Sequence, residues 1–230
     1  MRSTAVNLLQ SLLPGVARVE KNLEFLKTNV GNLDGLVHGF PRGAITEIFG
    51  PPSSGRTTLL HTFLASATRN GEYCALVDAS GNFDPESAEK AGLDLSRMFW
   101  VKCNRSNDKV QMEQALKCAD LLLHGGGWGV VVLDFGDISP LWLRRLPISY
   151  WYRFRRVIEP TPTVLVVLEQ EPFVRACASL ALELQPAQPN WAGAHADFRI
   201  LESAEVRIAL KKPVVRNTAV FSAQTLEKVG

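Results

Sequence analysis

Five stretches of this 230-residue chain are predominantly apolar, and segments with helical periodicity separate them. The apolar stretches cover residues 44–50, 72–79, 98–103, 128–135 and 163–170. Strands that are apolar on both faces are typical of a parallel sheet covered by helices on each side. The helices are expected at residues 57–67, 85–91, 109–123 and 139–157, with Asp84 as the N-cap of the second. The pattern predicts an α/β fold with a largely parallel, twisted sheet flanked by helices.

The two ends of the chain depart from this central pattern. Residues 179–185, 198–203 and 205–212 are short alternating segments, which are typical of antiparallel strands at one edge of a sheet. Residues 5–28 carry apolar side chains at helical spacing, which predicts two short amphipathic helices. We therefore expect an N-terminal helical extension over residues 1–30, a core over residues 31–212 and a C-terminal tail over residues 213–230.

Charge and cysteine content argue against several classes of protein. The formal net charge of +2 is too small to indicate nucleic-acid binding by itself. The four cysteines show no C-x-x-C spacing and do not cluster with the histidines, so we expect no zinc site and a reducing compartment. The N-terminus is too polar for a signal peptide, and no apolar run approaches the ~18 residues of a membrane span. These features predict a soluble, cytoplasmic protein.

Residues 50–58, GPPSSGRTT, follow the first core strand and nearly match the phosphate-loop pattern G-x-x-x-x-G-K-[ST]. In such a loop, backbone N–H groups and the N-terminus of the next helix surround phosphate oxygens. Thr57 takes the position whose hydroxyl binds Mg²⁺, and Asp134 ends a buried strand as the Walker B acid does. The nucleotide-binding residues predicted here are Gly50, Ser54, Gly55, Arg56, Thr57, Thr58 and Asp134.

Arg56 stands where the phosphate-loop pattern has lysine. A lysine ammonium is compact and touches the β- and γ-phosphates as a point charge, whereas a guanidinium is bulkier, planar and forked. Two outcomes stay open from the sequence: Arg56 neutralises a phosphate, or it fills the pocket and points to a carboxylate. We expect no required cofactor, and Thr57 and Asp134 would hold magnesium only if a nucleotide binds.

The segments EIFGPPSSGRTTL and CALVDASGNFDPESAEKAGLDLSRMFWVKC resemble the RecA family of recombinases, and the resemblance runs from about Gly31 to Phe221. The resemblance implies a RecA-like P-loop core. That family ends its second core strand with aspartate, a small residue and a glutamate that orients the attacking water. This chain has Asp78, Ala79 and Ser80 there, and a hydroxyl is too weakly basic for that role. Because a missing general base costs ~10²–10⁴ in rate, we expect a degenerate site without catalytic residues.

Further positions follow from the same resemblance. Gln170 stands where RecA-like ATPases carry a glutamine that senses the γ-phosphate. Lys211, or Lys212 after a small shift, aligns with a lysine that reaches a neighbouring subunit's nucleotide; a solvated strand end is the alternative for both. Only EPFVRACA lies between Gln170 and the next expected strand, so the family's long glycine-rich second DNA loop has no counterpart. This difference argues against a filament-forming strand-exchange enzyme.

Residues 139–156, SPLWLRRLPISYWYRFRR, interleave arginines with aromatic residues. Arginines that track phosphates and rings that stack on bases suit single-stranded DNA. Trp, Tyr and Arg are also enriched at protein–protein hot spots. A third interpretation is a covering helix, because the apolar residues recur at helical spacing. The residues predicted to bind DNA or a partner are Arg144, Arg145, Trp151, Arg153, Arg155, Arg156, Lys211 and Lys212.

A short RecA-like core, an eroded ATP site and the segment P-L-x-x-L-R-R-L together resemble the ImuA family, which is related to RecA and SulA. The resemblance implies a non-catalytic adaptor in SOS-induced translesion mutagenesis. Its implied partners are ImuB, RecA and, indirectly, an error-prone C-family DNA polymerase, in a cytoplasmic, nucleoid-associated setting. Two other functions stay open from the sequence: a weak DNA-stimulated ATPase of recombinase-paralogue type, and a single-strand DNA-binding module.

Overall fold

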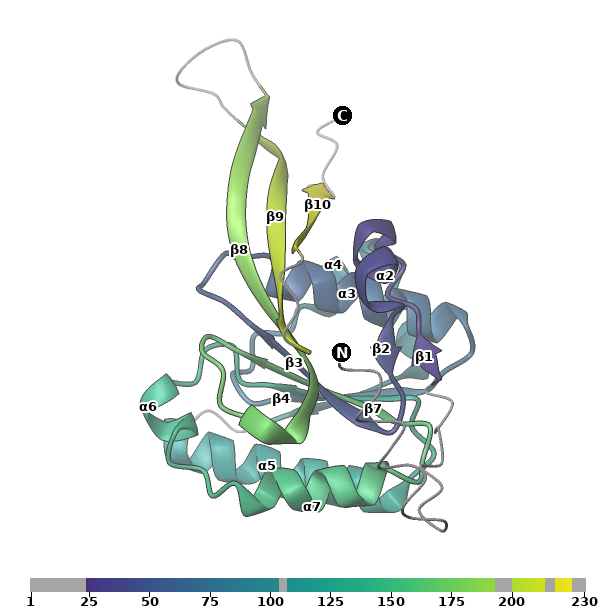
Figure 1. Cartoon of the computed structure of the whole chain (residues 1–230), viewed down its shortest axis with the longest axis vertical. Helices are drawn as coiled ribbons and strands as arrows, with labels where there is room; N and C mark the ends of the chain where they lie inside the picture. Colours follow the sequence, from purple (N-terminus) through teal and green to yellow (C-terminus); the bar gives the residue numbers. More distant parts are fainter. Residues whose placement is uncertain (1–23, 104–106, 193–199, 214–217, 225–230) are drawn as a thin grey trace, which may run out of the picture.

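A mostly parallel sheet lies at the centre of the structure, a computed structural model that describes residues 24–103, 107–192, 200–213 and 218–224 (Figure 1). Its strands are β3 (Ala44–Phe49), β4 (Cys74–Asp78), β5 (Met98–Lys102), β6 (Val130–Asp134), β7 (Val164–Glu169), β8 (Ala178–Ala192), β9 (Ile200–Lys212) and β10 (Thr218–Gln224). Their order across the sheet is β10-β9-β8-β3-β7-β6-β4-β5. Neighbours from β8 to β5 pair in parallel, whereas β9 pairs antiparallel with both β8 and β10. The predicted sheet with antiparallel strands at one edge is confirmed.

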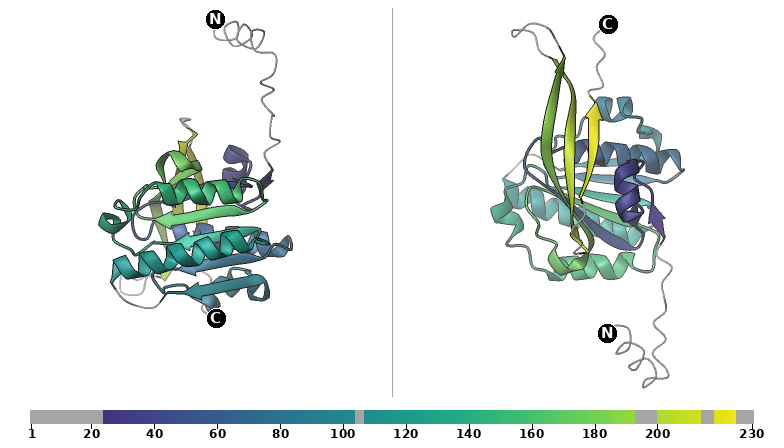
Figure 2. Two further views of the ribbon diagram at one scale, coloured as in Figure 1. Left: turned by 90° about the horizontal axis from the view of Figure 1, so that it is seen from below. Right: turned by 45° about the horizontal axis from the view of Figure 1, so that its top comes forward.

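Helices cover both faces of this sheet, as the sequence predicts (Figures 1 and 2). They are α2 (Gly31–Val37), α3 (Arg56–Arg69), α4 (Pro85–Lys90), α5 (Asp108–Gly125), α6 (Pro140–Leu143) and α7 (Ser149–Ile158), with 3₁₀ turns at Leu95–Arg97 and Arg175–Cys177. The Asp84 carboxylate accepts a hydrogen bond from the Glu86 N–H at 3.2 Å, which confirms Asp84 as the N-cap of α4. Within the described ranges, no helix is long and apolar enough to cross a membrane.

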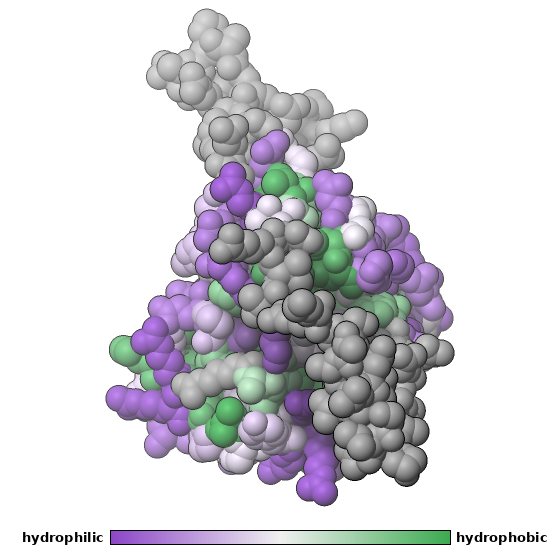
Figure 3. Space-filling view, in the orientation of Figure 1, coloured by the Kyte–Doolittle hydropathy of each residue, from purple (hydrophilic) through white to green (hydrophobic). Residues whose placement is uncertain are grey.

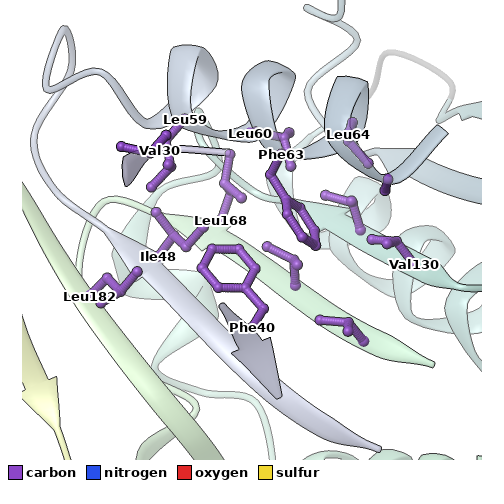
Figure 4. Close-up of a cluster of buried hydrophobic side chains, with 14 of the residues drawn as sticks. Val30, Phe40, Ile48, Leu59, Leu60, Phe63, Leu64, Val130, Leu168 and Leu182 are labelled. Carbon is purple, nitrogen blue, oxygen red and sulfur yellow. The ribbon is translucent and has the colours of Figure 1, made fainter. Parts of the chain in front are cut away.

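The continuous apolar strands arise because the sheet separates two hydrophobic cores. Val130 and Val132 of β6 belong to the core beneath α3, whereas Val131 and Leu133 belong to the core beneath α5 and α7. Since successive strand residues point to opposite faces, both sets must be apolar. The ring centroids of Phe40 and Phe63 lie 4.5 Å apart in the first core (Figure 4). Each fully buried large apolar side chain contributes about 1.5–3 kcal/mol to stability.

Three expectations about the C-terminal half are wrong. The helix predicted at residues 139–157 is split into α6 and α7, with Pro147 between them, because proline lacks the N–H and its ring clashes with a continuing helix. The strands predicted at 198–203 and 205–212 belong, from residue 200 onward, to the single strand β9, and residues 198–199 lie outside the described residues. The C-terminal tail predicted from residue 213 contains β10, which pairs with β9 from Thr218↔Ala209 onward. The sheet therefore extends past the predicted core boundary.

The N-terminal helical extension is also corrected in the part that the structure describes. Residues 1–23 of that prediction lie outside the described residues. Phe25–Leu26 form strand β1, which pairs antiparallel with β2 (Phe40–Pro41). The predicted helical extension cannot run through to residue 30 either. Asn29 has a left-handed φ of 65°, and its N–H donates to the Asp34 carboxylate at 3.1 Å. The Asp34 side chain thus fixes a turn that leads into α2.

Candidate nucleotide-binding site

The loop of residues 50–55 joins the carboxyl end of β3 to α3. A methyl group at Gly50 would lie 2.2 Å from the Leu184 carbonyl oxygen of β8, so only glycine fits there. Gly55 is the N-cap of α3 with a left-handed φ of 86°, a conformation that glycine adopts without strain. Ser54 Oγ is buried and has no hydrogen-bond partner among the described residues. With the unpaired N–H groups of the first helical turn, it gives the loop donors for an anion.

One pocket beside α3 brings together four of the residues singled out in the sequence: Arg56, Thr57, Ser80 and Asp134. They meet because the carboxyl ends of β3, β4 and β6, which belong to one run of parallel strands, lie at one edge of the sheet. The rest of the lining is Leu60, His61, Asn82, Phe83, Gly136, Asp137 and Leu168. The pocket therefore has donors, carboxylates and an apolar wall.

Arg56 lies in the acidic part of this pocket. Its side chain is only 9% exposed, and Nη1 has no hydrogen-bond partner in the described part of the chain. A methyl group at Gly136 would lie 3.4 Å from Arg56 Nη1 and 3.0 Å from Asp134 Oδ1, so guanidinium and carboxylate approach the same glycine. Burial lowers the pKa of Arg56, and the nearby carboxylates, Asp134 foremost, raise it. This geometry agrees with the second outcome left open by the sequence, in which the Arg56 guanidinium fills the pocket and points to a carboxylate.

Asp134, the last residue of β6, places its carboxylate beside the Gly136 N–H and the Arg56 guanidinium. Its Oδ1 accepts a hydrogen bond from the Gly136 N–H at 2.8 Å. Burial raises the pKa of Asp134 to about 6, although this hydrogen bond and the Arg56 charge lower it. A metal ligand must be deprotonated, and a carboxyl with a pKa near 6 is mostly ionised at pH 7, so a proton competes with a cation only below about pH 6. The positive charge of Arg56 would also repel a divalent cation.

Ser80 is engaged in the contacts that hold the pocket's rim. Its Oγ accepts a hydrogen bond from the Asp137 N–H at 3.3 Å, and the Asn82 amide donates to the Asp137 carboxylate. The buried Asp78 carboxylate accepts from the Gly81 N–H at 2.7 Å and fixes the loop that carries Ser80. A serine hydroxyl in this position offers no group that takes a proton from water at neutral pH.

The remaining predicted nucleotide residues lie around the pocket. Gly50, Ser54 and Gly55 shape the loop, and Thr58 is exposed on the first turn of α3. Gln170 Nε2 donates to the Gly136 carbonyl oxygen at 2.9 Å, so this amide links the end of β7 to the loop after β6. Its proposed contact with a γ-phosphate stays a prediction.

Sequence reasoning missed three polar side chains of this region. Asp137 follows Asp134 by three residues in the loop after β6, and only the structure shows that it turns back to the rim. His61 lies one helical turn after Thr57, so helical spacing could have placed it on the pocket side of α3. Burial lowers the pKa of His61, and its Nε2 has no partner among described residues. Burial and the neighbouring Glu47 raise the pKa of Glu169 well above its usual range.

The aromatic rings of residues 139–156 are mostly part of the core. Trp151 is 1% exposed and packs against Phe154 and Phe173, with ring centroids 5.9 and 5.3 Å apart. The prediction that Trp151 contacts DNA or a partner is therefore wrong, because its ring faces the sheet from α7. This burial fits a covering helix, with the arginines on its outer side.

The predicted cations differ in how far they are engaged. Arg153 forms an ion pair with Asp120 at 3.1 Å, and Arg144 pairs with Glu171. Lys211 pairs with Glu183 at 2.8 Å. The Lys212 ammonium donates to the Ala176 carbonyl at 2.9 Å and to that of Ala178, so Lys212 supports the turn before β8. Their roles toward a nucleotide, DNA or a partner stay predictions.

The fold places this chain among α/β proteins whose largely parallel sheet begins, in chain order, with a strand–loop–helix unit. The family model described as the RecA N-terminal domain matches residues 15–139 of this chain. Because the match covers more than half of the 230 residues, the chain belongs to the RecA N-terminal domain family. The matched range contains the loop, Ser80 and Asp134.

Proposed function

We propose that this RecA-like protein is a non-catalytic adaptor of the ImuA family that acts in SOS-induced translesion mutagenesis. One observation carries the non-catalytic part: Arg56 and Ser80 line the same pocket, where hydrolysis would need a lysine and a glutamate. The resemblance of the chain to ImuA proteins supports the adaptor part.

The residues present fit a phosphate better than they fit magnesium. Ser54 Oγ and the first N–H groups of α3 form a cradle for an anion. The metal position fits less well, because Arg56 already brings a positive charge to Gly136, beside Asp134 Oδ1. We therefore propose no hydrolytic step and no required cofactor.

The adaptor would work through its surfaces. RecA-type subunits associate head to tail through complementary faces, and a related core without catalytic groups would cap or join a RecA filament and damp recombination there. ImuB is the second proposed partner, and it would connect the protein to an error-prone C-family polymerase. These associations would place the protein at the nucleoid.

A capture experiment with purified components tests this proposal. The full chain, immobilised without nucleotide, is expected to retain ImuB and RecA, because binding depends on shape and not on an ATP cycle. An unrelated α/β protein of similar size serves as the control for non-specific adhesion. The adaptor function would be refuted if the immobilised chain retained neither ImuB nor RecA.

A further inference from the structure

The outward side of α7 carries apolar and cationic side chains in one stripe. Ile148, at the N-cap, is 39% exposed, and Tyr152, one turn later, is 51% exposed. Arg155 and Arg156 follow in the next turn and are also exposed. Residues three and four apart lie on the same side of a helix, so these four side chains form a continuous strip. We call Ile148, Tyr152, Arg155 and Arg156 the α7 stripe.

The aromatic residues on the opposite side of α7 are buried, so the stripe is not an extension of the core. Trp151 and Phe154 face the sheet and are almost fully buried. The neighbouring helix α6 adds another apolar side chain to the outside, Leu141, which is 67% exposed. In Figure 1, α6 and α7 lie in the lower part of the molecule. The same part of Figure 3 shows hydrophilic and hydrophobic side chains next to one another.

The charge of the stripe is not balanced within the described part of the chain. Nearby cations do have partners: Arg144 pairs with Glu171, and Arg153 pairs with Asp120. Among the described residues, no carboxylate forms an ion pair with Arg155 or Arg156. Both arginines lie in the last turn of α7, where the negative end of the helix dipole offsets part of their charge. The remaining positive charge comes from the two guanidinium groups and suits an anionic partner.

A protein segment fits this surface better than single-stranded nucleic acid does. Proteins that bind single strands stack successive bases on several rings. Here Trp151 and Phe154 are buried, and Arg145 and Arg153 lie over the rings of Trp142 and Tyr150. Exposed isoleucine and leucine offer nothing specific to a base, but they pack well against apolar side chains of a protein partner.

We propose that the α7 stripe docks an acidic amphipathic segment of a partner protein. Apolar side chains of that segment would pack on Ile148 and Tyr152, and its carboxylates would pair with Arg155 and Arg156. Arginine suits such pairs, because its planar fork binds a carboxylate through two hydrogen bonds. The inference rests on the proposed adaptor function, and it names the chemistry of the segment that the adaptor recognises.

A charge-swap titration tests this docking site in the full chain. The probe is an amphipathic peptide of about 16 residues, several helical turns, with leucines on one side and glutamates on the other. A second peptide carries lysines in place of the glutamates. Wild-type protein is expected to bind the glutamate peptide, and the double variant Arg155→Glu/Arg156→Glu to bind it about tenfold or more weakly and to prefer the lysine peptide.

A control with the same change in net charge reverses two exposed cations on the other side of the sheet, Arg69→Glu on α3 and Lys90→Glu on α4, of which Lys90 also pairs with Glu86. This control should leave affinity for the glutamate peptide unchanged, and circular dichroism confirms that each variant folds. Equal loss in both double variants would overturn the docking site, because net charge alone would then explain binding. Binding of oligo(dT), in place of the peptide, that depends on Arg155 and Arg156 would also overturn it.

The same variants separate this inference from the adaptor function. Retention of ImuB or RecA by Arg155→Glu/Arg156→Glu at wild-type level would refute the docking site and leave the adaptor function standing. Loss of retention in that variant, but not in the α3–α4 control, would support both.

Discussion

Replacing Arg56 by lysine and Ser80 by glutamate in the same chain is expected to raise ATP hydrolysis by about 10²-fold over the wild-type protein. The lysine would remove the bulky guanidinium from the acidic side of the pocket and reach the phosphates as a point charge. The glutamate would restore a carboxylate that takes a proton from the attacking water. Single-turnover release of phosphate, with the protein in excess over ATP, measures the change.

The pocket itself suggests the controls for this experiment. Arg56→Lys with Ser80→Gln has nearly the same volume but no general base, and it should stay at the wild-type rate. A carboxylate at position 80 would line the same pocket as the Asp137 carboxylate, so adding Asp137→Asn should increase the gain by reducing like-charge repulsion. Hydrolysis by the wild-type protein that disappears in Asp134→Ala would contradict the proposed loss of catalysis.

Replacing Trp151 by alanine is expected to lower the free energy of unfolding by about 3–5 kcal/mol. The indole is 1% exposed and packs on Phe154 and Phe173, so its removal leaves a cavity in the core beneath α5 and α7. Urea denaturation, followed by circular dichroism, measures the change in stability.

The adjacent residue provides the comparison. Tyr152 lies on the same helix and is 51% exposed, so Tyr152→Ala should change stability by less than about 0.5 kcal/mol. If Trp151 served chiefly as a stacking platform for DNA, Trp151→Ala would leave the urea midpoint unchanged and weaken oligonucleotide binding instead. That result would contradict the position of the indole in the core.

The central strands could be predicted because burial on two faces leaves a strong signal. β6 and β7 are apolar at nearly every position, and the sequence placed them within two residues of their observed ends. β10 was missed because it mixes polar and apolar residues, and β1 and β2 were missed because each is only two residues long. The pairing of all three strands also depends on segments distant in sequence. The split between α6 and α7 was missed although Pro147 marks it, because the apolar residues on both sides keep helical spacing.

Some residues of the candidate site could be predicted from the sequence, and others could not. The sequence predicted one site for Arg56, Thr57, Ser80 and Asp134, and the four residues line one pocket. Each follows or ends a strand whose carboxyl end meets the same edge of the sheet. Asp137 reaches the pocket only because its loop folds back, and no local pattern predicts that. Trp151 was assigned to the surface because an arginine–aromatic pattern has the same composition in a covering helix as in a binding face.

The most direct test of the proposed loss of catalysis is a calorimetric titration of ATP into the wild-type protein with and without Mg²⁺. The positive charge of Arg56, which lies beside Asp134 Oδ1 at Gly136, opposes a divalent cation in the pocket. We therefore predict that adding Mg²⁺ changes the Kd for ATP by no more than about twofold. Mg²⁺ that tightens ATP binding by about tenfold or more, an effect lost in Asp134→Ala, would contradict this prediction and restore a working nucleotide site.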